Sequence, residues 1–283
     1  MSISLVRNSY GKSRVRLVKV RRAAERHELT DIDVDIELEG DFDDAYTQGD
    51  NSKVLPTDTM KNTVYALAKS HPVEPIEDFG VLLAEHFLGK PHARRARVAI
   101  AEKVWSRIDA GGAPHPHAFL RAAGERRTAE ITAAPGGVAI VSGIEDLLVL
   151  KTTGSAFSGF PRDQYTTLKE TDDRILSTLM VARWRAPAGR RDEAPTATWE
   201  SARRALLETF AGQHSLSVQH TIHALGEAVL AACPAVDELS LSLPNKHCLL
   251  VDLSRFGLSN DNEIFVPVDE PHGLIHATMK RGG

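Results

Sequence analysis

The sequence predicts an α+β protein in which antiparallel sheets carry helices on one face. Residues 31–38 alternate acidic and aliphatic side chains, the period-two pattern of a half-buried antiparallel strand. Residues 218–232 repeat apolar side chains at helical spacing. The order of strands, two helices and strands occurs twice along the 283 residues. We therefore expect two domains, at residues 1–135 and 136–283, because a domain usually has ~100–200 residues.

The first half opens with a strand at 14–21, rich in β-branched side chains. After the strand at 31–38, a helix begins at Thr57 or Asp58, either of which can cap it, and stops before Pro72. A second helix begins near Pro75, a residue that suits the first helical position, and ends at Gly89. Glycine turns then separate further strands at 98–105, 117–121 and 128–132.

The second half repeats this order. Its first strands are expected at 138–141, 147–150 and 175–184. Segment 187–195, with its prolines and arginines, is expected to be a loop, after which Thr198 caps a helix. Ser215 or Ser217 caps the next helix, which stops at Pro234. The last strands are expected at 239–243, 248–251 and 263–267.

Composition and charge narrow the class of protein. Lys and Arg number 34 and Asp and Glu 38, so the formal net charge of −4 disfavours a dedicated nucleic-acid binder. No apolar run reaches the ~18 residues of a membrane helix, and the N-terminus has no signal-peptide stretch. Two cysteines, Cys233 and Cys248, exclude a disulfide framework and fit a reducing compartment.

Common cofactor and metal motifs are missing from the sequence. There is no Walker loop, no G-x-G-x-x-G after a strand, no H-E-x-x-H and no G-x-S-x-G. His115 and His117 have the spacing of a ligand pair, but no Cys or carboxylate lies nearby, so we interpret them as part of a turn. We therefore expect neither a metal nor a dinucleotide cofactor.

Several polar segments beside predicted helix and strand ends are not explained by the fold alone. They lie at 8–12, 50–58, 151–162, 166–174, 217–219 and 243–247. Each has an ordinary interpretation as a turn, a cap or a solvated loop. Phe157 and Phe160 either fill the core or offer a stacking surface, because no periodic pattern includes them. Gln219 is either simply exposed or part of an anion site at a helix N-terminus. Segment 243–247, which ends in His247, is expected to join two strands.

Together and in order, these segments resemble the urate oxidase (uricase) family over residues 8 to 276. The most specific blocks are Tyr-Thr-Thr-Leu-Lys-Glu-Thr at 165–171 and Leu-Pro-Asn-Lys-His at 243–247. The resemblance implies two tandem tunnelling-fold (T-fold) domains, each a four-stranded antiparallel sheet with two helices on one face. It also implies a homotetramer whose sheets close into a barrel, with each active site shared by two chains.

The resemblance also implies roles for individual residues. Phe157 would stack on the flat purine, and Arg174 would clamp urate through two hydrogen bonds, which its planar fork suits. The Gln219 amide would grip the opposite edge of the ring, since it donates and accepts at once. The backbone N–H of Val218 would contact that same edge.

The neighbouring chain would complete the site. Lys12 and Thr57 would face the ring, with the Asp58 N–H close by. Lys12, Thr57 and His247 would form a proton relay, in which Thr57 passes a proton to Lys12 acting as the base. Asn245 would hold dioxygen or water above the purine plane.

The reaction implied by the family is the oxidation of urate by O₂ and water to 5-hydroxyisourate and hydrogen peroxide in purine degradation. It requires no metal and no organic cofactor, because deprotonated urate is itself electron-rich. The protein supplies proton removal and orientation instead. Eukaryotic members commonly end in a peroxisomal tripeptide, whereas this sequence ends in Gly282-Gly283, so we expect a cytoplasmic protein.

Two alternatives stay open on the sequence alone. Another tunnelling-fold enzyme, acting on a pterin or a related purine, would typically anchor its ring with a glutamate, whereas Arg174 with Gln219 suits an anionic, carbonyl-rich ring. A purine-binding protein without catalysis would keep the fold, but the presence of Lys12, Thr57 and His247 argues against lost activity. Binding of urate without turnover would support this second alternative.

Overall fold

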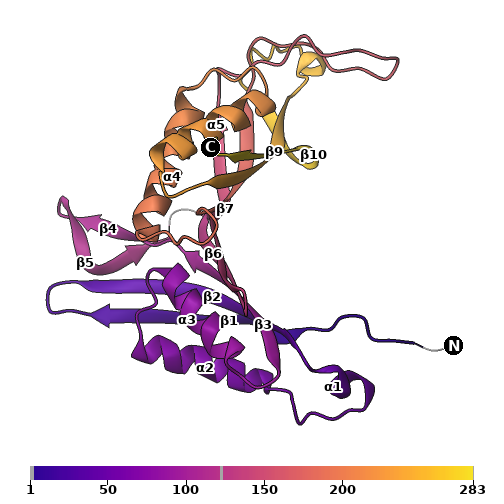
Figure 1. Cartoon of the computed structure of the whole chain (residues 1–283). Helices are drawn as coiled ribbons and strands as arrows, with labels where there is room; N and C mark the ends of the chain where they lie inside the picture. The colour runs from indigo at the N-terminus through magenta and orange to yellow at the C-terminus, as the bar shows by residue number, and fades with distance from the viewer. Residues whose placement is uncertain (1–2, 122–123, 283) are drawn as a thin grey trace. The chain divides into compact units, whose positions relative to one another are not determined.

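The computed structural model describes residues 3–121 and 124–282 (Figure 1). By its internal contacts the chain divides into two compact units, Met1–Gly143 and Ile144–Gly283. The division falls inside strand β7 (Gly137–Lys151). The functional domain limits 1–135 and 136–283 stay a prediction.

The first unit is built on four strands in the spatial order β1 (Tyr10–Arg22), β2 (His27–Gly40), β3 (Ala93–Lys103) and β6 (Arg126–Ala134). Each neighbouring pair is antiparallel. Two helices cover one face of this sheet, α2 (Thr57–Ser70) over β1 and α3 (Ile76–Leu88) over β3 and β6 (Figure 1). The short α1 (Asp43–Thr47) and the hairpin β4 (Ser106–Ala110) and β5 (Ala113–Leu120) complete the unit.

The alternation in β2 decides which face of the sheet the helices cover. Ile32, Val34, Ile36 and Leu38 are each at most 3% exposed, and they meet the apolar faces of α2 and α3. Burying each such side chain contributes about 1.5–3 kcal/mol. The predicted strand at 31–38 and the predicted helices near 57–70 and 76–88 are confirmed.

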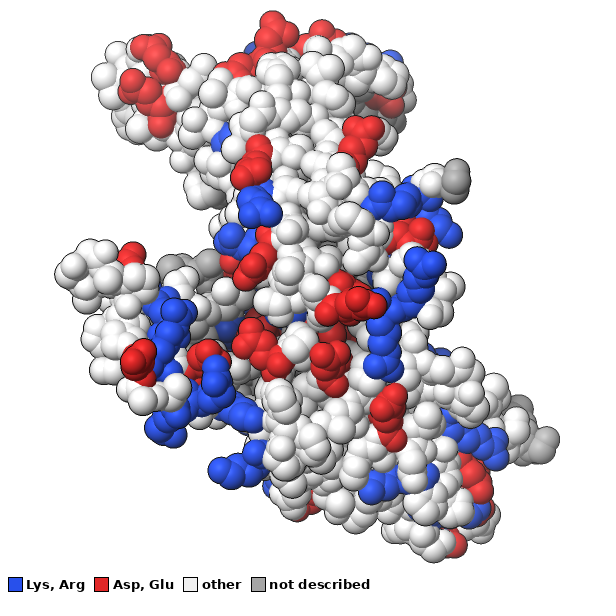
Figure 2. Space-filling model, turned by 60° about the vertical axis from the view of Figure 1, so that its left-hand side comes forward, with Lys and Arg blue, Asp and Glu red and all other residues white. Residues whose placement is uncertain are grey.

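The opposite face of this sheet carries charges. Glu39 pairs with Arg95 at 2.9 Å, and the Lys103 amine lies 2.8 Å from Asp33, so acids of β2 face bases of β3. Figure 2 likewise shows acidic and basic side chains interspersed over the visible surface. Because the two signs alternate, this face has no uniformly basic patch of the kind that nucleic acids select.

The second unit has the strand order β7, β8 (Leu176–Arg185), β9 (Glu238–Leu250) and β10 (Phe265–Lys280). The pairings of β8 with β9 and of β9 with β10 are antiparallel. Helix α5 (Val218–Ala232) packs on β9 and β10, and α4 (Pro195–Gly212) packs on α5, on the same side of the sheet (Figure 1). A 3₁₀ turn, η1 (Ser254–Phe256), precedes β10. The α+β class is therefore confirmed in both units.

The predicted helix caps are correct at one position and wrong at two. Ser217 caps α5, because its hydroxyl accepts the His220 N–H at 3.0 Å. Helix α2 has Pro56 at its N-cap and no side-chain cap, so neither Thr57 nor Asp58 fills that role. Thr198 is inside α4, where its N–H donates to the Ala194 carbonyl, because Pro195 with its fixed φ starts the helix three residues earlier.

Strand boundaries required three corrections. The predicted strands at 138–141 and 147–150 are one continuous strand, β7. His115 and His117 lie within β5 and not in a turn, since the turn is formed by Gly111 and Gly112 with positive φ. Segment 243–247 does not join two strands, because it is the middle of β9.

The last of these positions contains a proline. Pro244 has no N–H, and proline is usually excluded from a central strand. Strand β9 nevertheless continues, and the irregularity falls next to it on β10, whose pairing with β9 is interrupted between Val268 and Gly273. Strand β10 itself extends to Lys280, well beyond the predicted 263–267. Within the described residues no helix is long and apolar enough to cross a membrane.

Candidate active site

The segment between β7 and β8 brings an aromatic ring and a guanidinium together. The Arg174 Cζ lies 5.1 Å from the centroid of the Phe157 ring, a cation–π contact. Two backbone hydrogen bonds fix this arrangement, from Phe157 N to Thr171 O at 2.8 Å and from Thr171 N to Phe157 O at 3.0 Å. The segment thus offers a flat apolar surface beside a positive charge.

The Arg174 guanidinium has a hydrogen-bond donor that no other group uses among the described residues. The residue is half-buried, and its Nε is buried without a hydrogen-bond partner among the described residues. Burial lowers the pKa of the Arg174 guanidinium, which nevertheless stays protonated because arginine is so strong a base. An unpaired buried donor costs about 1–3 kcal/mol. A ligand that accepts from this nitrogen would recover that cost.

Phe157 and Phe160 lie against each other and do not fill the core. Their ring centroids are 5.0 Å apart with an interplanar angle of 15°. Both side chains are only half-buried, and the Arg162 guanidinium lies over Phe160 at 5.3 Å. The two rings are therefore not part of the buried core, and a stacking role for them stays a prediction.

The N-terminus of α5 lies beside this segment. The Ser215 N–H donates to the Gly154 carbonyl at 2.8 Å, and the Ala156 N–H donates to the Ser215 carbonyl at 2.7 Å. Val218 and Gln219 follow directly as the first residues of α5, Val218 buried and Gln219 exposed. Their N–H groups have no acceptor within the helix, which makes this end suited to an anionic ligand edge.

Asn245 and His247 lie two residues apart on β9, so they share one face of the sheet. Asn245 is opposite Thr178 of β8 and Gly273 of β10. The Thr178 side chain is fully buried, and its hydroxyl has no hydrogen-bond partner among the described residues. In the sequence, Thr178 is marked only by a single hydroxyl between Leu176 and Met180 on an apolar face.

The remaining predicted residues lie in the first unit. Lys12 is on β1 just before a bulge, where Arg14 has a φ of +55° and its N–H donates to Asp35 at 2.7 Å. Gly11 is required there, because a Cβ would approach the Ile36 carbonyl oxygen to 1.8 Å. The bulge turns the chain next to Lys12 and ends its regular pairing with β2.

Thr57 and Asp58 open helix α2 close to Lys12. The Tyr10 hydroxyl accepts the Leu55 N–H at 2.9 Å, which ties the approach to α2 onto β1. A hydrogen bond from Lys61 lowers the pKa of Asp58, and the positive charge of Lys12 lowers it further. Lys12, Thr57 and Asp58 therefore form one group within this unit.

The structure thus brings the predicted residues together as two groups. Lys12, Thr57 and Asp58 form the first. The second group belongs to the other unit: Phe157 and Arg174 are in contact, Val218 and Gln219 begin α5, and Asn245 and His247 lie on β9, the strand next to β8. No set of three His, Cys, Asp or Glu side chains suited to a metal ion occurs in the part of the chain that is described.

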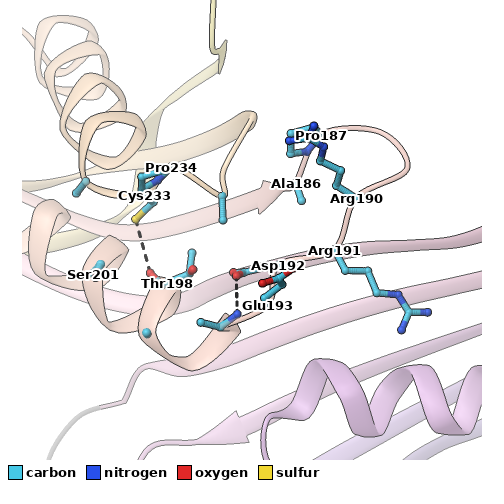
Figure 3. Close-up of a pocket in the computed structure, with 14 residues that line it drawn as sticks. Ala186, Pro187, Arg190, Arg191, Asp192, Glu193, Thr198, Ser201, Cys233 and Pro234 are labelled. Atoms are coloured by element: carbon cyan, nitrogen blue, oxygen red, sulfur yellow. Dashed lines mark hydrogen bonds between the residues drawn. The ribbon is translucent and has the colours of Figure 1, made fainter.

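A pocket of about 490 Å³ lies elsewhere in the second unit (Figure 3). It is bounded by the loop before α4, the first turns of α4, and residues 232–235. The Cys233 thiol points to the Thr198 carbonyl at 3.7 Å, and Asp192 accepts the Ala194 N–H at 2.9 Å. None of the predicted site residues lines this pocket, so it is separate from the two groups above.

Helix-covered antiparallel sheets, a half-buried aromatic ring beside a guanidinium and a nearby helix N-terminus define an α+β protein with a candidate ligand site in its second unit. The sequence model of the Uricase family matches residues 8–132 and 140–276. The chain therefore belongs to the uricase family, whose name is that of the enzyme urate oxidase.

Individual relatives agree. The uricase of Arthrobacter globiformis is 48% identical over 282 residues, which cover 99% of this chain and 91% of that protein. The uricase of Emericella nidulans is 43% identical, covering 96% of this chain and 95% of its own. The crystal structure of the Arthrobacter globiformis uricase superposes with a TM-score of 0.92, covering 100% of this chain and 96% of the other.

Proposed function

We propose that this protein oxidises urate with O₂ and water to 5-hydroxyisourate and hydrogen peroxide, using no metal and no organic cofactor, as a step of purine degradation. The observation that carries the proposal is the position of the Arg174 guanidinium over the Phe157 ring with its Nε buried and unpaired. Urate is a flat anion with adjacent ring N and carbonyl O acceptors, and these two groups match its face and its edge.

Binding would use the second group of residues. The purine stacks on Phe157 while Arg174 donates to one edge through two hydrogen bonds. The Gln219 amide and the Val218 N–H hold the opposite edge, where the free N–H groups of α5 favour negative charge. Asn245 holds dioxygen or water above the ring plane. Fixing the three reactants in this way supplies the proximity contribution to the rate.

Chemistry would use the first group together with His247. Lys12 withdraws a proton from urate through the hydroxyl of Thr57, and the Asp58 N–H faces the ring. An electron pair passes from the deprotonated purine to O₂, which takes up two protons and leaves as hydrogen peroxide. Water adds at the purine C5, and Lys12, Thr57 and His247 move the proton that it releases. Atoms balance, since urate, O₂ and water together equal the two products.

Catalysis on this plan requires a homotetramer. We propose that each unit is a T-fold domain, that the sheets of different chains join into a barrel, and that Lys12, Thr57 and Asp58 of one chain complete the site of another. Strands β1 and β10 are the two edge strands of the order β1-β2-β3-β6-β7-β8-β9-β10, and open edges favour such joining. Large apolar side chains are exposed along these two strands, namely Val18, Val20, Val266 and Leu274.

The cytoplasmic location is also part of the proposal. Cys233 and Cys248 are free thiols, which fits a reducing compartment. Urate, O₂ and other copies of this chain are the partners that the proposal needs, and neither nucleic acid nor a membrane takes part.

The function is tested by turnover after metal removal. The purified protein is dialysed against a chelator and mixed with urate in air, and urate absorbance and peroxide are followed together. Loss of urate with an equal yield of peroxide and no response to added metal ions is the expected result. Saturable urate binding without turnover would favour a purine-binding protein instead. Neither binding nor turnover would redirect the search to pterins.

A further inference from the structure

A carboxylate next to the clamp arginine holds the segment that carries the stacking ring. Asp173 accepts from the Thr153 hydroxyl at 2.7 Å, from the Gly154 N–H at 2.7 Å and from the Ser155 N–H at 3.3 Å. The hydrogen bond from Thr153 lowers the pKa of Asp173, so the group is an ionised acceptor near neutral pH. Such charge-assisted hydrogen bonds are the stronger kind.

Gly154 connects this carboxylate to the other side of the site. Its N–H donates to Asp173, while its carbonyl accepts the Ser215 N–H at 2.8 Å. Gly154 has a φ of +73°, a conformation that glycine adopts without strain. Gly154 therefore links the two residues, because its N–H bonds to Asp173 and its carbonyl bonds to Ser215.

Ser215 in turn is fixed to the start of α5. It is fully buried, its hydroxyl donates to the Ser217 carbonyl at 3.0 Å, and it accepts from the Thr221 hydroxyl at 2.7 Å. Ser217 is the cap of α5, and Val218 and Gln219 follow it. An unbroken series of hydrogen bonds thus runs from Asp173 to the residues proposed to hold the far edge of the ligand.

We propose that Asp173 is a positioning residue, which sets the spacing between Arg174 and Gln219 by anchoring the backbone at Gly154. The inference rests on the proposed function, because it assumes that these two residues grip opposite edges of urate. Asp173 precedes Arg174 directly, so its anchoring fixes the direction in which the backbone delivers the guanidinium. Thr171, whose hydroxyl donates to the Asp173 carbonyl at 2.7 Å, connects the same turn to Phe157.

The carboxylate is not itself a ligand group for urate. An anion beside an anionic purine would repel it, and the three donors on residues 153–155 already use most of the acceptor capacity of Asp173. Its effect therefore passes through the geometry of Arg174 and Gln219. A rigid ring binds both edges at one fixed separation, so a small change in the spacing weakens both contacts together.

The test compares variants of the full-length protein in urate turnover. Asp173→Ala removes all three acceptor contacts, and we expect KM for urate to rise roughly tenfold, the effect of one lost hydrogen bond to a charged group. Asp173→Asn keeps an oxygen for the two backbone N–H groups and should recover most of that loss. Thr153→Val removes one donor alone and should fall between Asp173→Asn and the parent. The exposed neighbour serves as the matched control, because Asp172→Ala leaves these contacts intact.

The readout separates positioning from simple stability. A positioning role predicts a raised KM with the thermal midpoint nearly unchanged, whereas a KM within twofold of the parent, with only kcat or the midpoint reduced, would overturn it. Turnover by the parent protein decides the proposed function independently of the variants. If the parent binds urate without turnover, the same comparison is made with urate dissociation constants from calorimetry. If it does neither, both proposals fall.

Discussion

The guanidinium carbon of Arg174 lies 5.1 Å from the centroid of the Phe157 ring, although the two residues are separated by a polar segment without regular secondary structure. A paired Phe157–Thr171 backbone holds them together. One segment therefore places an aromatic ring and a positive charge side by side, as the proposed binding of a purine requires.

Arg174→Ala should weaken urate recognition by about 1.5–3 kcal/mol, since a hydrogen bond to a charged group is lost. Arg174→Lys should recover little of it, because an ammonium cannot make the two parallel hydrogen bonds of a guanidinium. The measurement is the urate KM together with kcat/KM. Arg162→Ala, which removes a similar cation from the Phe160 ring, is the control and should leave KM unchanged. Unchanged kinetics in Arg174→Ala would remove the clamp assignment.

Gly11→Ala should destabilise the protein and displace Lys12. The added Cβ would lie 1.8 Å from the Ile36 carbonyl oxygen, so β1 and β2 must separate next to the bulge. Overpacking of this kind costs about 1–3 kcal/mol. Thermal unfolding and kcat are measured together, and both should fall. Gly212→Ala is the matched control, because nothing lies within 4 Å of the added methyl group.

Breaking the buried ion pair between Glu77 and Arg127 should lower the free energy of unfolding strongly. The two groups are 2.6 Å apart with side chains 3% and 4% exposed, and Ser142 also donates to Glu77. Arg127→Met should lower the free energy of unfolding by about 3–5 kcal/mol, because it leaves a buried carboxylate without its cation. Breaking the partly exposed pair of Arg97 and Glu130 by Arg97→Met should cost only about 0–1 kcal/mol. Equal losses in the two variants would contradict this difference.

Glu102 should make stability depend on pH. Burial raises the pKa of Glu102 from 4.5 to about 7, an effect that Arg127 opposes and Glu74 and Glu77 reinforce. Between pH 4.5 and about 7, Glu102 keeps its proton in the native state but has lost it in the unfolded state. The free energy of unfolding is therefore greatest below pH 4.5 and falls as pH rises through about 7. The full loss is about 3 kcal/mol.

Glu102→Gln cannot ionise and should lack this dependence. Denaturant unfolding of the parent and the variant at pH 5 and pH 8 makes the comparison. The variant should gain stability relative to the parent at the higher pH. A difference between the two proteins that is the same at both pH values would show that Glu102 does not titrate in this range.

Regular patterns made most of the fold predictable. The alternation at 31–38 and the apolar face of 218–232 each follow from one periodicity, and both elements are present. Two of the errors in element boundaries lie at prolines, whose effect on the backbone the hydrophobic pattern does not describe. Pro195 starts α4 ahead of Thr198, and β9 continues through Pro244, which pairs with Leu274 of β10.

The candidate site was predictable in a different way. Phe157, Arg174 and Gln219 have no periodic pattern in common, and only their resemblance to a family suggested that they act together. Their proximity depends on hydrogen bonds such as those of Asp173 and Ser215, which join residues far apart in the sequence. That Thr178 lies opposite Asn245 could not be predicted, because the sheet register decides this relationship.

The central claim is that two chains build each active site, and mixing two inactive variants tests it most directly. Lys12→Met keeps an intact second group, and Arg174→Ala keeps an intact first group. In hybrid tetramers assembled at random from both, about a quarter of the sites would combine the two intact groups by symmetry. We expect urate oxidation to return to about a quarter of the parent activity. Confirmed hybrids that stay inactive would contradict it and would assign both groups to a single chain.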